Sequence, residues 1–438
     1  MVKTDATVSP AGDVPTLRAV TRPLGKLPNL LAFADEHAPL FWNRGDRGCV
    51  GIGELLRLSF TGPDRFRAAS ARWREIAALA AVDDPVAMPG SGLVAFGTFA
   101  FADESAAVSV LIVPRLLIHR HRGTAWVTEV TLAGETSELE RGADPAELLP
   151  TERAVDAASW AGVELRPAGS TVDAYLAGVA DATARVVAGE LEKVVLSRQI
   201  AGSVSRGSDL RVPLARLSER YLDCWTFAVD GLIGASPETL VRSTSGAVSA
   251  RVLAGTRGRH QEDAARDRAA RDELLRSAKE QHEHDFAVQS VVTALAPHVT
   301  ELRTSDAPFA LQLPNVWHLA TDLGAALGAE STALELVDAL HPTAAVAGTP
   351  TADAVAMIAE LEPFDRGRYS GAVGWIDAAG DGEWVIALRC AQLGEAGPDG
   401  ARALVATAGG GIVEGSDPQH ELGETVSKFR PITEAFGG

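Results

Sequence analysis

Two periodicities of hydrophobic and polar residues run along this chain, and they predict both helices and strands. Apolar residues recurring every three to four positions predict helices near 63–82, over 173–187 and over 261–297. Because strands follow one another in consecutive runs between these helices, the pattern favours an α+β fold with mainly antiparallel sheets over a doubly wound parallel sheet. The predicted strands are short apolar runs at 92–97, 107–114, 193–198, 225–229, 232–235, 247–252, 370–376, 384–391 and 403–408.

Composition shifts suggest how the chain is organised. Residues 1–28 are rich in Pro, Thr and Gly and are interpreted as a loose lead-in. A polar stretch over 134–150 is either a linker or a surface excursion. We therefore predict an N-terminal part over 29–165 and a catalytic region over 166–438, within one large unit.

Charge and cysteine usage narrow the class of protein. The chain has 438 residues and a formal net charge of −18, which argues against a nucleic-acid or anionic-membrane surface. Its three cysteines show neither a disulfide framework nor zinc-ligand spacing. With no signal-peptide pattern and no apolar run of membrane-spanning length, we expect a soluble cytoplasmic protein.

The C-terminal region carries the most informative motif. Three glycines, Gly409–Gly411, precede a predicted helix whose start at 417–418 combines a capping aspartate with a proline. From there Glu421, Glu424 and Lys428 have the i, i+3, i+7 spacing of one helical face. The sequence therefore predicts two carboxylates and an ammonium side by side near a glycine-rich strand.

The simplest interpretation of that face is a solvated helix with an intrahelical ion pair. An apolar stripe of Leu422, Val426 and Phe429 would anchor the helix. A second pair of carboxylates far upstream argues against this interpretation.

A second pair of acidic residues lies upstream, in the predicted helix over 261–297. Glu280 and Glu283 are again i, i+3 on one helical face. Divalent cations such as Mg²⁺ prefer oxygen ligands, so two carboxylate pairs suggest a magnesium site. A zinc site at His282 and His284 is less favoured, because the order is H-E-H instead of H-E-x-x-H.

With these segments side by side, the chain resembles the chorismate-utilising enzymes, a family that includes isochorismate synthase, salicylate synthase and anthranilate synthase component I. The resemblance covers about 170–438. It rests on eight motifs in one order, which are 193–198 (KVVLSR), 236–238 (SPE), 253–257 (LAGTR), 279–284 (KEQHEH), 341–343 (HPT), 369–371 (YSG), 388–389 (LR) and 409–428. It implies one large α+β unit with two packed antiparallel sheets and outer helices, and a monomer.

Within the resemblance, two positions indicate the nucleophile. The amino-transferring members have Gln where this chain has Lys193, and aminodeoxychorismate enzymes have a nucleophilic Lys where it has Ala254. The resemblance therefore implies water as nucleophile with Lys193 as base, and Glu238 as the acid that protonates the leaving C4 hydroxyl. Without the resemblance to this family, Lys193 would be interpreted as a strand-edge lysine and Glu238 as a turn residue.

The resemblance also implies a binding site for chorismate and Mg²⁺. Glu283 and Glu424 would contact the metal directly, with Glu280 and Glu421 holding its waters. Four acids without a metal would repel a dicarboxylate substrate. The implied substrate-binding residues are Thr256, His318, His341, Tyr369, Arg389, Gly409 and Lys428, although His341 fits a structural role equally well.

Several activities fit these residues. Isochorismate synthase is favoured, because dedicated salicylate enzymes lack the His-Pro-Thr run at 341–343 and tend to have Thr in place of Ala345. Tyr369 favours the salicylate alternative, since some isochorismate synthases have Phe there. Anthranilate synthase component I is less favoured. A non-catalytic divalent-cation-binding protein would use the two acidic pairs but not Lys193 or Glu238.

Overall fold

A computed structural model describes residues 7–8, 14–27, 29–260, 262–312 and 316–437, without the side chains of residues 7, 8, 159, 256, 279, 283 and 316. The chain forms two compact units. The first comprises Met1–Glu238, His341–Ala379 and Val385–Gly438, and the second comprises Thr239–Leu340 and Gly380–Trp384. The predicted division into 1–28, 29–165 and 166–438 stays a prediction.

The first unit is built on one long run of antiparallel strands. Following hydrogen-bonded neighbours, the order is β10-β22-β21-β12-β11-β3-β4-β7, after which β7 pairs with both β8 and β6. The strands of this run are β10 (Lys193–Val204), β22 (Arg402–Ile412), β21 (Cys390–Ala396), β12 (Leu232–Ser236), β11 (Trp225–Val229), β3 (Leu40–Arg44), β4 (Arg47–Phe60), β7 (Ser109–His121), β8 (Thr124–Leu132) and β6 (Val94–Thr98).

Further strands extend this run. They are β1 (Thr7–Val8), β2 (Leu17–Leu24), β5 (Ala81–Asp83), β9 (Arg166–Ala168), β18 (Gly348–Thr349) and β19 (Ala372–Asp377). The pairs β1–β4 and β2–β5 are parallel, whereas β2–β8, β9–β10, β18–β10 and β19–β6 are antiparallel. The predicted α+β class with mainly antiparallel strands is therefore confirmed.

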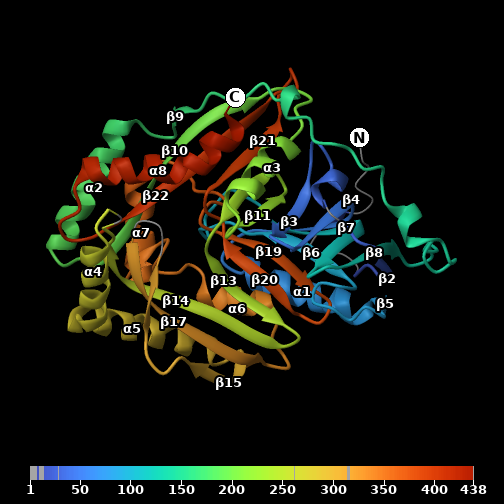
Figure 1. Ribbon diagram of the computed structural model, residues 1–438, viewed down its shortest axis with the longest axis horizontal. Helices are drawn as coiled ribbons and strands as arrows, with labels where there is room; N and C mark the ends of the chain where they lie inside the picture. Colours follow the sequence, from blue (N-terminus) through green and yellow to red (C-terminus); the bar gives the residue numbers. More distant parts are fainter. Residues whose placement is uncertain (1–6, 9–13, 28, 261, 313–315, 438) are drawn as a thin grey trace. The chain divides into compact units, whose positions relative to one another are not determined.

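Helices of the first unit cover these strands. They are α1 (Arg65–Leu79), α2 (Val172–Val187), α3 (Arg211–Arg220), α7 (Thr351–Leu361) and α8 (Pro418–Phe436), with short 3-10 turns at Leu31–Phe33, Pro145–Leu148 and Ala157–Ser159. Figure 1 shows α2 and α8 side by side along β10 and β22, the strands that carry the predicted base and the three glycines. Phe429, Ile432 and Phe436 of α8 lie in the larger core cluster, and this packing holds the helix against the sheet.

The second unit is a smaller sheet with three helices against it. Its elements are β13 (Thr239–Thr244), β14 (Ala247–Gly258), α4 (Ala264–Arg276), α5 (Ala278–Leu295), β15 (Val299–Thr304), β16 (Phe309–Gln312), β17 (Val316–Leu327) and α6 (Ala333–Leu340), and β20 (Gly382–Ile386) begins in it. The central pair is β14 with β17, which is antiparallel. Val288 of α5 packs against Val252 and Leu323 of this pair.

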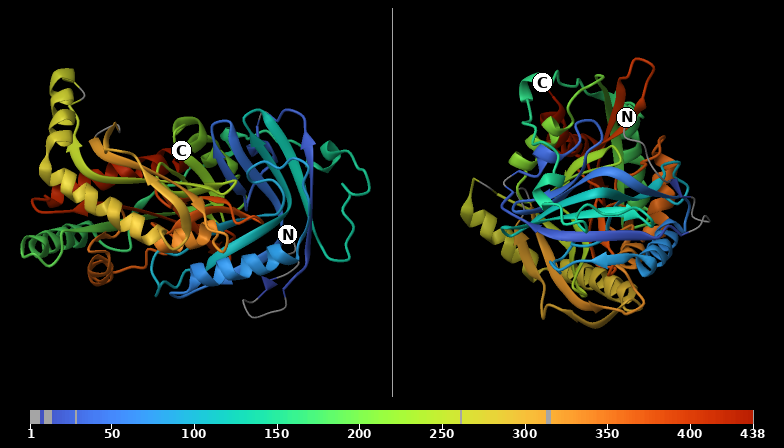
Figure 2. Two further views of the ribbon diagram at one scale, coloured as in Figure 1. Left: turned by 90° about the horizontal axis from the view of Figure 1, so that it is seen from below. Right: turned by 90° about the vertical axis from the view of Figure 1, so that its right-hand side faces the viewer.

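The predicted unbroken helix over 261–297 was wrong. It divides at Ser277, whose backbone is extended (ψ 108°) and whose hydroxyl caps α5 by accepting a hydrogen bond from the Glu280 N–H. Figure 2 shows α4 and α5 running in different directions. Residue 261 lies outside the described residues. The expected apolar position Phe286 is 67% exposed, and His284 is buried instead.

The predicted strand over 384–391 was also wrong. It ends at Ile386 and resumes at Cys390, because Arg389 has a left-handed backbone with φ 50°. In α8 the helix start at Asp417 and Pro418 is confirmed, but the expected apolar position Val426 is 58% exposed. Among the described residues, no helix is both long and apolar enough to cross a membrane.

Candidate active site

Lys193 and the three glycines lie together where β10 pairs with β22. In this antiparallel pair Val195 lies opposite Gly411 and Leu196 opposite Gly410. A Cβ atom at Gly411 would lie 2.7 Å from Cε and 3.5 Å from Nζ of Lys193. Carbon atoms pack at about 3.5–4.0 Å. Only glycine at position 411 therefore leaves room for the Lys193 side chain to cross β22 and keep its amine in the observed position.

Gly410 makes room for a glutamate in the same way. A Cβ atom at Gly410 would lie 3.0 Å from Oε2 of Glu421 on α8. Successive residues of a strand face opposite sides, so Gly410 serves the helix and Gly411 serves the lysine. The glycine run thus permits two close approaches, one on each side of β22.

Glu421 is buried, at 6% exposure, although it carries a carboxylate. Its Oε1 accepts a hydrogen bond from the Ser416 hydroxyl at 2.9 Å, and its Oε2 has no hydrogen-bond partner among the described residues. Burial raises the pKa of Glu421, and the nearby charge of Glu424 raises it further. A buried carboxylate with an unpaired oxygen is a suitable ligand for a cation.

The surrounding residues complete a possible metal-binding group. One ligand atom each from His420, Glu421 and Glu424 lies within 4.8 Å of the others. The two carboxylates suit Mg²⁺, so the donor set fits the metal that the resemblance implies. His420 was missed by the sequence analysis, although its i, i+4 spacing to Glu424 could have shown it.

Lys428 has a structural partner on each side of it. Its Nζ is 2.5 Å from Oε1 of Glu424 and donates a hydrogen bond to the Gly409 carbonyl at 2.7 Å. The predicted one-face arrangement of Glu424 and Lys428 is therefore observed. The ammonium also joins α8 to the glycine strand.

Glu238 is a carboxylic acid whose pKa is raised by its surroundings. It follows β12, where its N–H donates to the Ser236 hydroxyl at 3.3 Å and that hydroxyl donates to the Ile386 carbonyl at 2.6 Å. Part of the Glu238 side chain is accessible, but burial among the surrounding protein raises its pKa. The positive charges of Lys193, Arg389 and Lys428 act in the opposite direction and lower it. An acid whose pKa is raised keeps its proton nearer to neutral pH.

The charges that lower the pKa of Glu238 place three cations around it. The charges of Lys193, Arg389 and Lys428 all act on this one carboxyl group, so the first unit brings together these four predicted site residues. They come from four separate segments, β10, the end of β12, the break between β20 and β21, and α8. The predicted acid, the predicted base and two further cations therefore share one region of the first unit.

Arg389 is presented by a strained backbone. Its left-handed φ interrupts the strand, and its carbonyl accepts a hydrogen bond from Ala235 N–H at 3.1 Å. Among the described residues its guanidinium makes no hydrogen bond or ion pair. A positive backbone φ in a non-glycine residue is costly and is often found at functional sites. The guanidinium is thus a candidate partner for an anionic ligand.

Tyr369 lies in a buried turn, and the buried His341 contacts that turn. Burial raises the pKa of Tyr369 to about 12. The His341 Nε2 lies 2.9 Å from the carbonyl oxygen of Ser370, and its ring lies against Phe66 and Phe101. Burial lowers the pKa of His341 to about 4, so the ring is neutral near pH 7. These contacts favour the structural alternative for His341, which supports the turn carrying Tyr369.

The second unit holds the remaining predicted residues. Thr256 lies opposite His318 in the β14–β17 pair, and a Cβ atom at Gly255 would lie 3.1 Å from Oε2 of Glu280. Glu280 of α5, Thr256 of β14 and His318 of β17 are thus near one another in the second unit. The side chains of Thr256 and Glu283 lie outside the described part of the structure.

The histidines of α5 do not favour zinc. Both ring nitrogens of His284 are occupied, with Nδ1 3.0 Å from the Ala254 carbonyl and Nε2 2.7 Å from the Thr321 hydroxyl. Burial lowers the pKa of His284. His282 is exposed. His284 therefore holds α5 to the β14–β17 pair.

Comparisons with known proteins identify similar sequences and structures. The isochorismate synthase DhbC of Bacillus subtilis is 40% identical over 275 residues, which cover 60% of this chain and 67% of that protein. The salicylate biosynthesis isochorismate synthase of Pseudomonas aeruginosa is 33% identical over 433 residues, covering 94% of this chain and 88% of that protein. A crystal structure of a putative 2,3-dihydroxybenzoate-specific isochorismate synthase, DhbC from Bacillus anthracis, matches with a TM-score of 0.67 and 29% identity, over 93% of this chain and 98% of that one.

The family itself is shown by a match along nearly the whole sequence. Residues 15–437 match the family described as chorismate binding enzyme. The match includes the N-terminal part, for which the sequence motifs alone gave little indication. The predicted family is therefore confirmed, and this chain belongs to the chorismate binding enzymes.

Proposed function

We propose that this chain is an isochorismate synthase, which isomerises chorismate to isochorismate with Mg²⁺. The observation that carries the proposal is the raised pKa of Glu238 beside Lys193, Arg389 and Lys428. An acid and a base within one cationic region suit a reaction that adds water at one ring carbon and removes a hydroxyl group from another.

In the proposed reaction, a water molecule attacks C2 of chorismate and gives one proton to the Lys193 amine. The ring double bond shifts, the C4–O bond breaks, and Glu238 donates a proton so that the hydroxyl leaves as water. One water is consumed and one is released, so the product is an isomer of the substrate. The lysine ends protonated and the glutamate ionised, which is the correct starting state for the reverse reaction.

The substrate's two carboxylates need cationic partners. Arg389, whose guanidinium makes no hydrogen bond or ion pair among the described residues, is proposed to hold the pyruvyl carboxylate together with Tyr369. Glu421 and Glu424 are proposed to hold Mg²⁺, which supplies the positive charge that the ring carboxylate requires. Glu280, Glu283, Thr256, His318, His341, Gly409 and Lys428 stay predicted site residues.

A product assay tests the proposal. The purified full chain is incubated with chorismate, with and without Mg²⁺, and the products are separated by chromatography. Isochorismate that forms only with Mg²⁺ is expected, and Lys193→Ala and Glu238→Gln should each abolish it. Stoichiometric salicylate and pyruvate at neutral pH would instead favour the salicylate alternative, for which Tyr369 is the supporting residue. Full turnover by Lys193→Ala would remove the lysine from the mechanism.

A cytoplasmic location and a monomeric state belong to the same proposal. They rest on the acidic charge, on three free cysteines and on the family resemblance. Size-exclusion chromatography with light scattering measures the assembly state directly.

A further inference from the structure

A buried ion pair lies within the first unit and is not part of the acid–base group. Glu362 directly follows α7, and Arg366 lies four residues later. Arg366 Nη2 is 2.6 Å from Oε1 of Glu362, and its Nε is 2.8 Å from Oε2. The side chains are 2% and 3% exposed for Arg366 and Glu362. The two residues therefore form a bidentate pair that is almost fully removed from solvent.

Three further hydrogen bonds of this pair go to β10, the strand that carries the proposed base. Glu362 Oε1 accepts from the Ser197 N–H at 2.6 Å and from the Ser197 hydroxyl at 2.9 Å. Arg366 Nη2 donates to the Val195 carbonyl at 2.7 Å. Val195 and Ser197 are two and four residues from Lys193, so the pair holds β10 directly beside the lysine.

The same guanidinium reaches two other segments of the site. Its Nη1 donates to the Val346 carbonyl at 2.9 Å, in the segment after the His-Pro-Thr run. Its central carbon lies 4.7 Å from the ring centre of Phe101 and 6.0 Å from that of Tyr369. One arginine thus connects the base strand, that segment and the predicted substrate-binding tyrosine.

The space beside Glu362 is too small for a substrate. The cavity beside it, lined also by Tyr175 and Ser197, has a volume of about 10 Å³. That volume holds about one water molecule, far less than a substrate. Burying a charge pair also brings little net stability compared with apolar side chains of the same size. The arrangement is therefore better explained by the geometry that it imposes.

We propose that Glu362 and Arg366 are a positioning pair that fixes β10 and Tyr369 so that Lys193 meets the attacking water. The inference rests on the proposed function, because it assigns Lys193 as the base. Displacement of a catalytic group by about 1 Å lowers the rate about a hundredfold. A pair that anchors the strand within four residues of the base can control that distance.

The test compares kcat and KM of full-length variants with chorismate and Mg²⁺. Glu362→Gln places an amide NH₂ against the Arg366 Nε–H, and Arg366→Lys loses the fork that donates to two carbonyls and a carboxylate. Each should lower kcat about 10- to 100-fold while KM for chorismate stays within about threefold of the wild type. Ser197→Ala removes one hydrogen bond and leaves the ion pair, so it should fold and lower kcat a few-fold.

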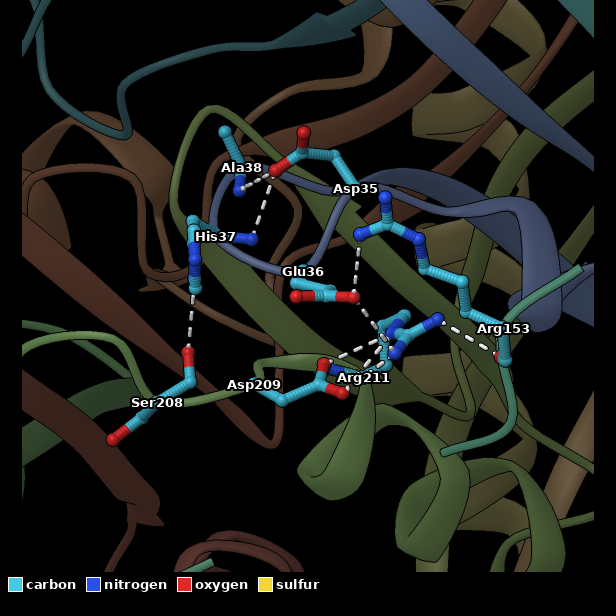
Figure 3. Close-up of polar contacts among 8 residues, drawn as sticks. All are labelled: Asp35, Glu36, His37, Ala38, Arg153, Ser208, Asp209 and Arg211. Atoms are coloured by element: carbon cyan, nitrogen blue, oxygen red, sulfur yellow. Dashed lines mark hydrogen bonds and ion pairs between the residues drawn. The ribbon is translucent and has the colours of Figure 1, made fainter. Parts of the chain in front are cut away.

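Arg211→Lys is the matched control. Arg211 is a buried arginine of the same unit, paired with Asp209 at 2.7 Å and Glu36 at 3.3 Å and donating to the Arg153 carbonyl, as Figure 3 shows. None of its partners is a proposed site residue. It should lower the melting temperature as Arg366→Lys does, but leave kcat unchanged.

The outcomes separate the two proposals. Wild-type kcat in both Glu362→Gln and Ser197→Ala would overturn the positioning role while the proposed function stands. A fall of kcat in Arg211→Lys in proportion to its lost stability would also overturn it, since the effect would then be general. A wild-type chain that does not convert chorismate would overturn the proposed function first, and the positioning role with it.

Discussion

Replacing Gly411 by alanine should separate catalysis from folding more cleanly than any substitution of a charged residue. The new Cβ atom would lie 2.7 Å from Cε of Lys193. That atom belongs to the far part of a flexible side chain and not to the backbone, so the lysine can yield and the strand need not. The expected product is a folded protein with a displaced amine.

The size of the effect follows from the geometry. Carbon atoms in contact are about 3.5–4.0 Å apart, so Cε must move by about 1 Å to accept the methyl group. A shift of about 1 Å in a catalytic group lowers the rate about a hundredfold. This corresponds to about 2.7 kcal/mol in the activation free energy. Because the amine and not the binding of substrate is disturbed, the loss should fall on kcat.

The assay measures kcat and KM for chorismate in Gly411→Ala, with Gly394→Ala as the control. Gly394 lies in β21, and a Cβ atom there would meet its nearest neighbour, Ala403, at an ordinary 3.7 Å. The control should keep the wild-type kcat, and both variants should unfold at similar temperatures. An unchanged kcat in Gly411→Ala would refute the reasoning, unless Lys193→Ala is also active. In that case the lysine is not the base and the error lies there.

Three further expectations concern metal, stability and pH. Gly410→Ala places a Cβ atom 3.0 Å from Oε2 of Glu421, so it should weaken Mg²⁺ binding measured by calorimetry. Saturating Mg²⁺ should then restore kcat. An unchanged affinity for Mg²⁺ would remove Glu421 from the metal site. Glu238→Gln should abolish turnover yet raise the free energy of unfolding at pH 7. The raised pKa of Glu238 makes its ionisation costly there, and the gain should vanish at a pH low enough to protonate the glutamate in both states. Burial lowers the pKa of His341 from 6.5 to about 4 on folding, so protonation of the unfolded chain destabilises the wild type as the pH falls. Between pH 8 and pH 5 the free energy of unfolding of the wild type, measured by urea titration, should therefore fall by about 2 kcal/mol more than that of His341→Gln. Equal losses in the two proteins would contradict this expectation.

Features that depend on local sequence were predictable. The start of α8 followed from Asp417 and Pro418, because capping involves only the next few residues and the side chain of Asp417 accepts from the His420 N–H. The α+β class followed from the order of strands and helices. The pairing of Glu421 with Glu424 followed from helical spacing, and the structure places their carboxylates together.

Features that depend on tertiary contacts were not predictable. The run over 384–391 is apolar apart from Arg389 itself, and this pattern does not show that the strand breaks there. In α8 the buried stripe includes Glu421 and Thr425 and excludes Val426, because a polar site lies under the helix. A hydrophobic pattern cannot foresee a buried carboxylate. The contacts of Glu362 and Arg366 with β10 join residues about 165 apart in sequence, and no local signal reports them.

The cations around Glu238 create a conflict that the substrate itself can resolve. In the free enzyme Lys193, Arg389 and Lys428 oppose the effect of burial and hold the pKa of Glu238 below the value that burial alone would give. A substrate carboxylate bound at Arg389 cancels part of that positive charge and excludes water, and both effects raise the pKa of the acid. Binding would therefore load the proton that the reaction needs. The pH profile of kcat/KM reports the pKa values of the free enzyme, and the pH profile of kcat reports those of the enzyme–substrate complex. The basic limb assigned to Glu238 should therefore lie at higher pH in the kcat profile than in the kcat/KM profile. Coincident limbs in the two profiles would show that the carboxylate binds away from this carboxyl group.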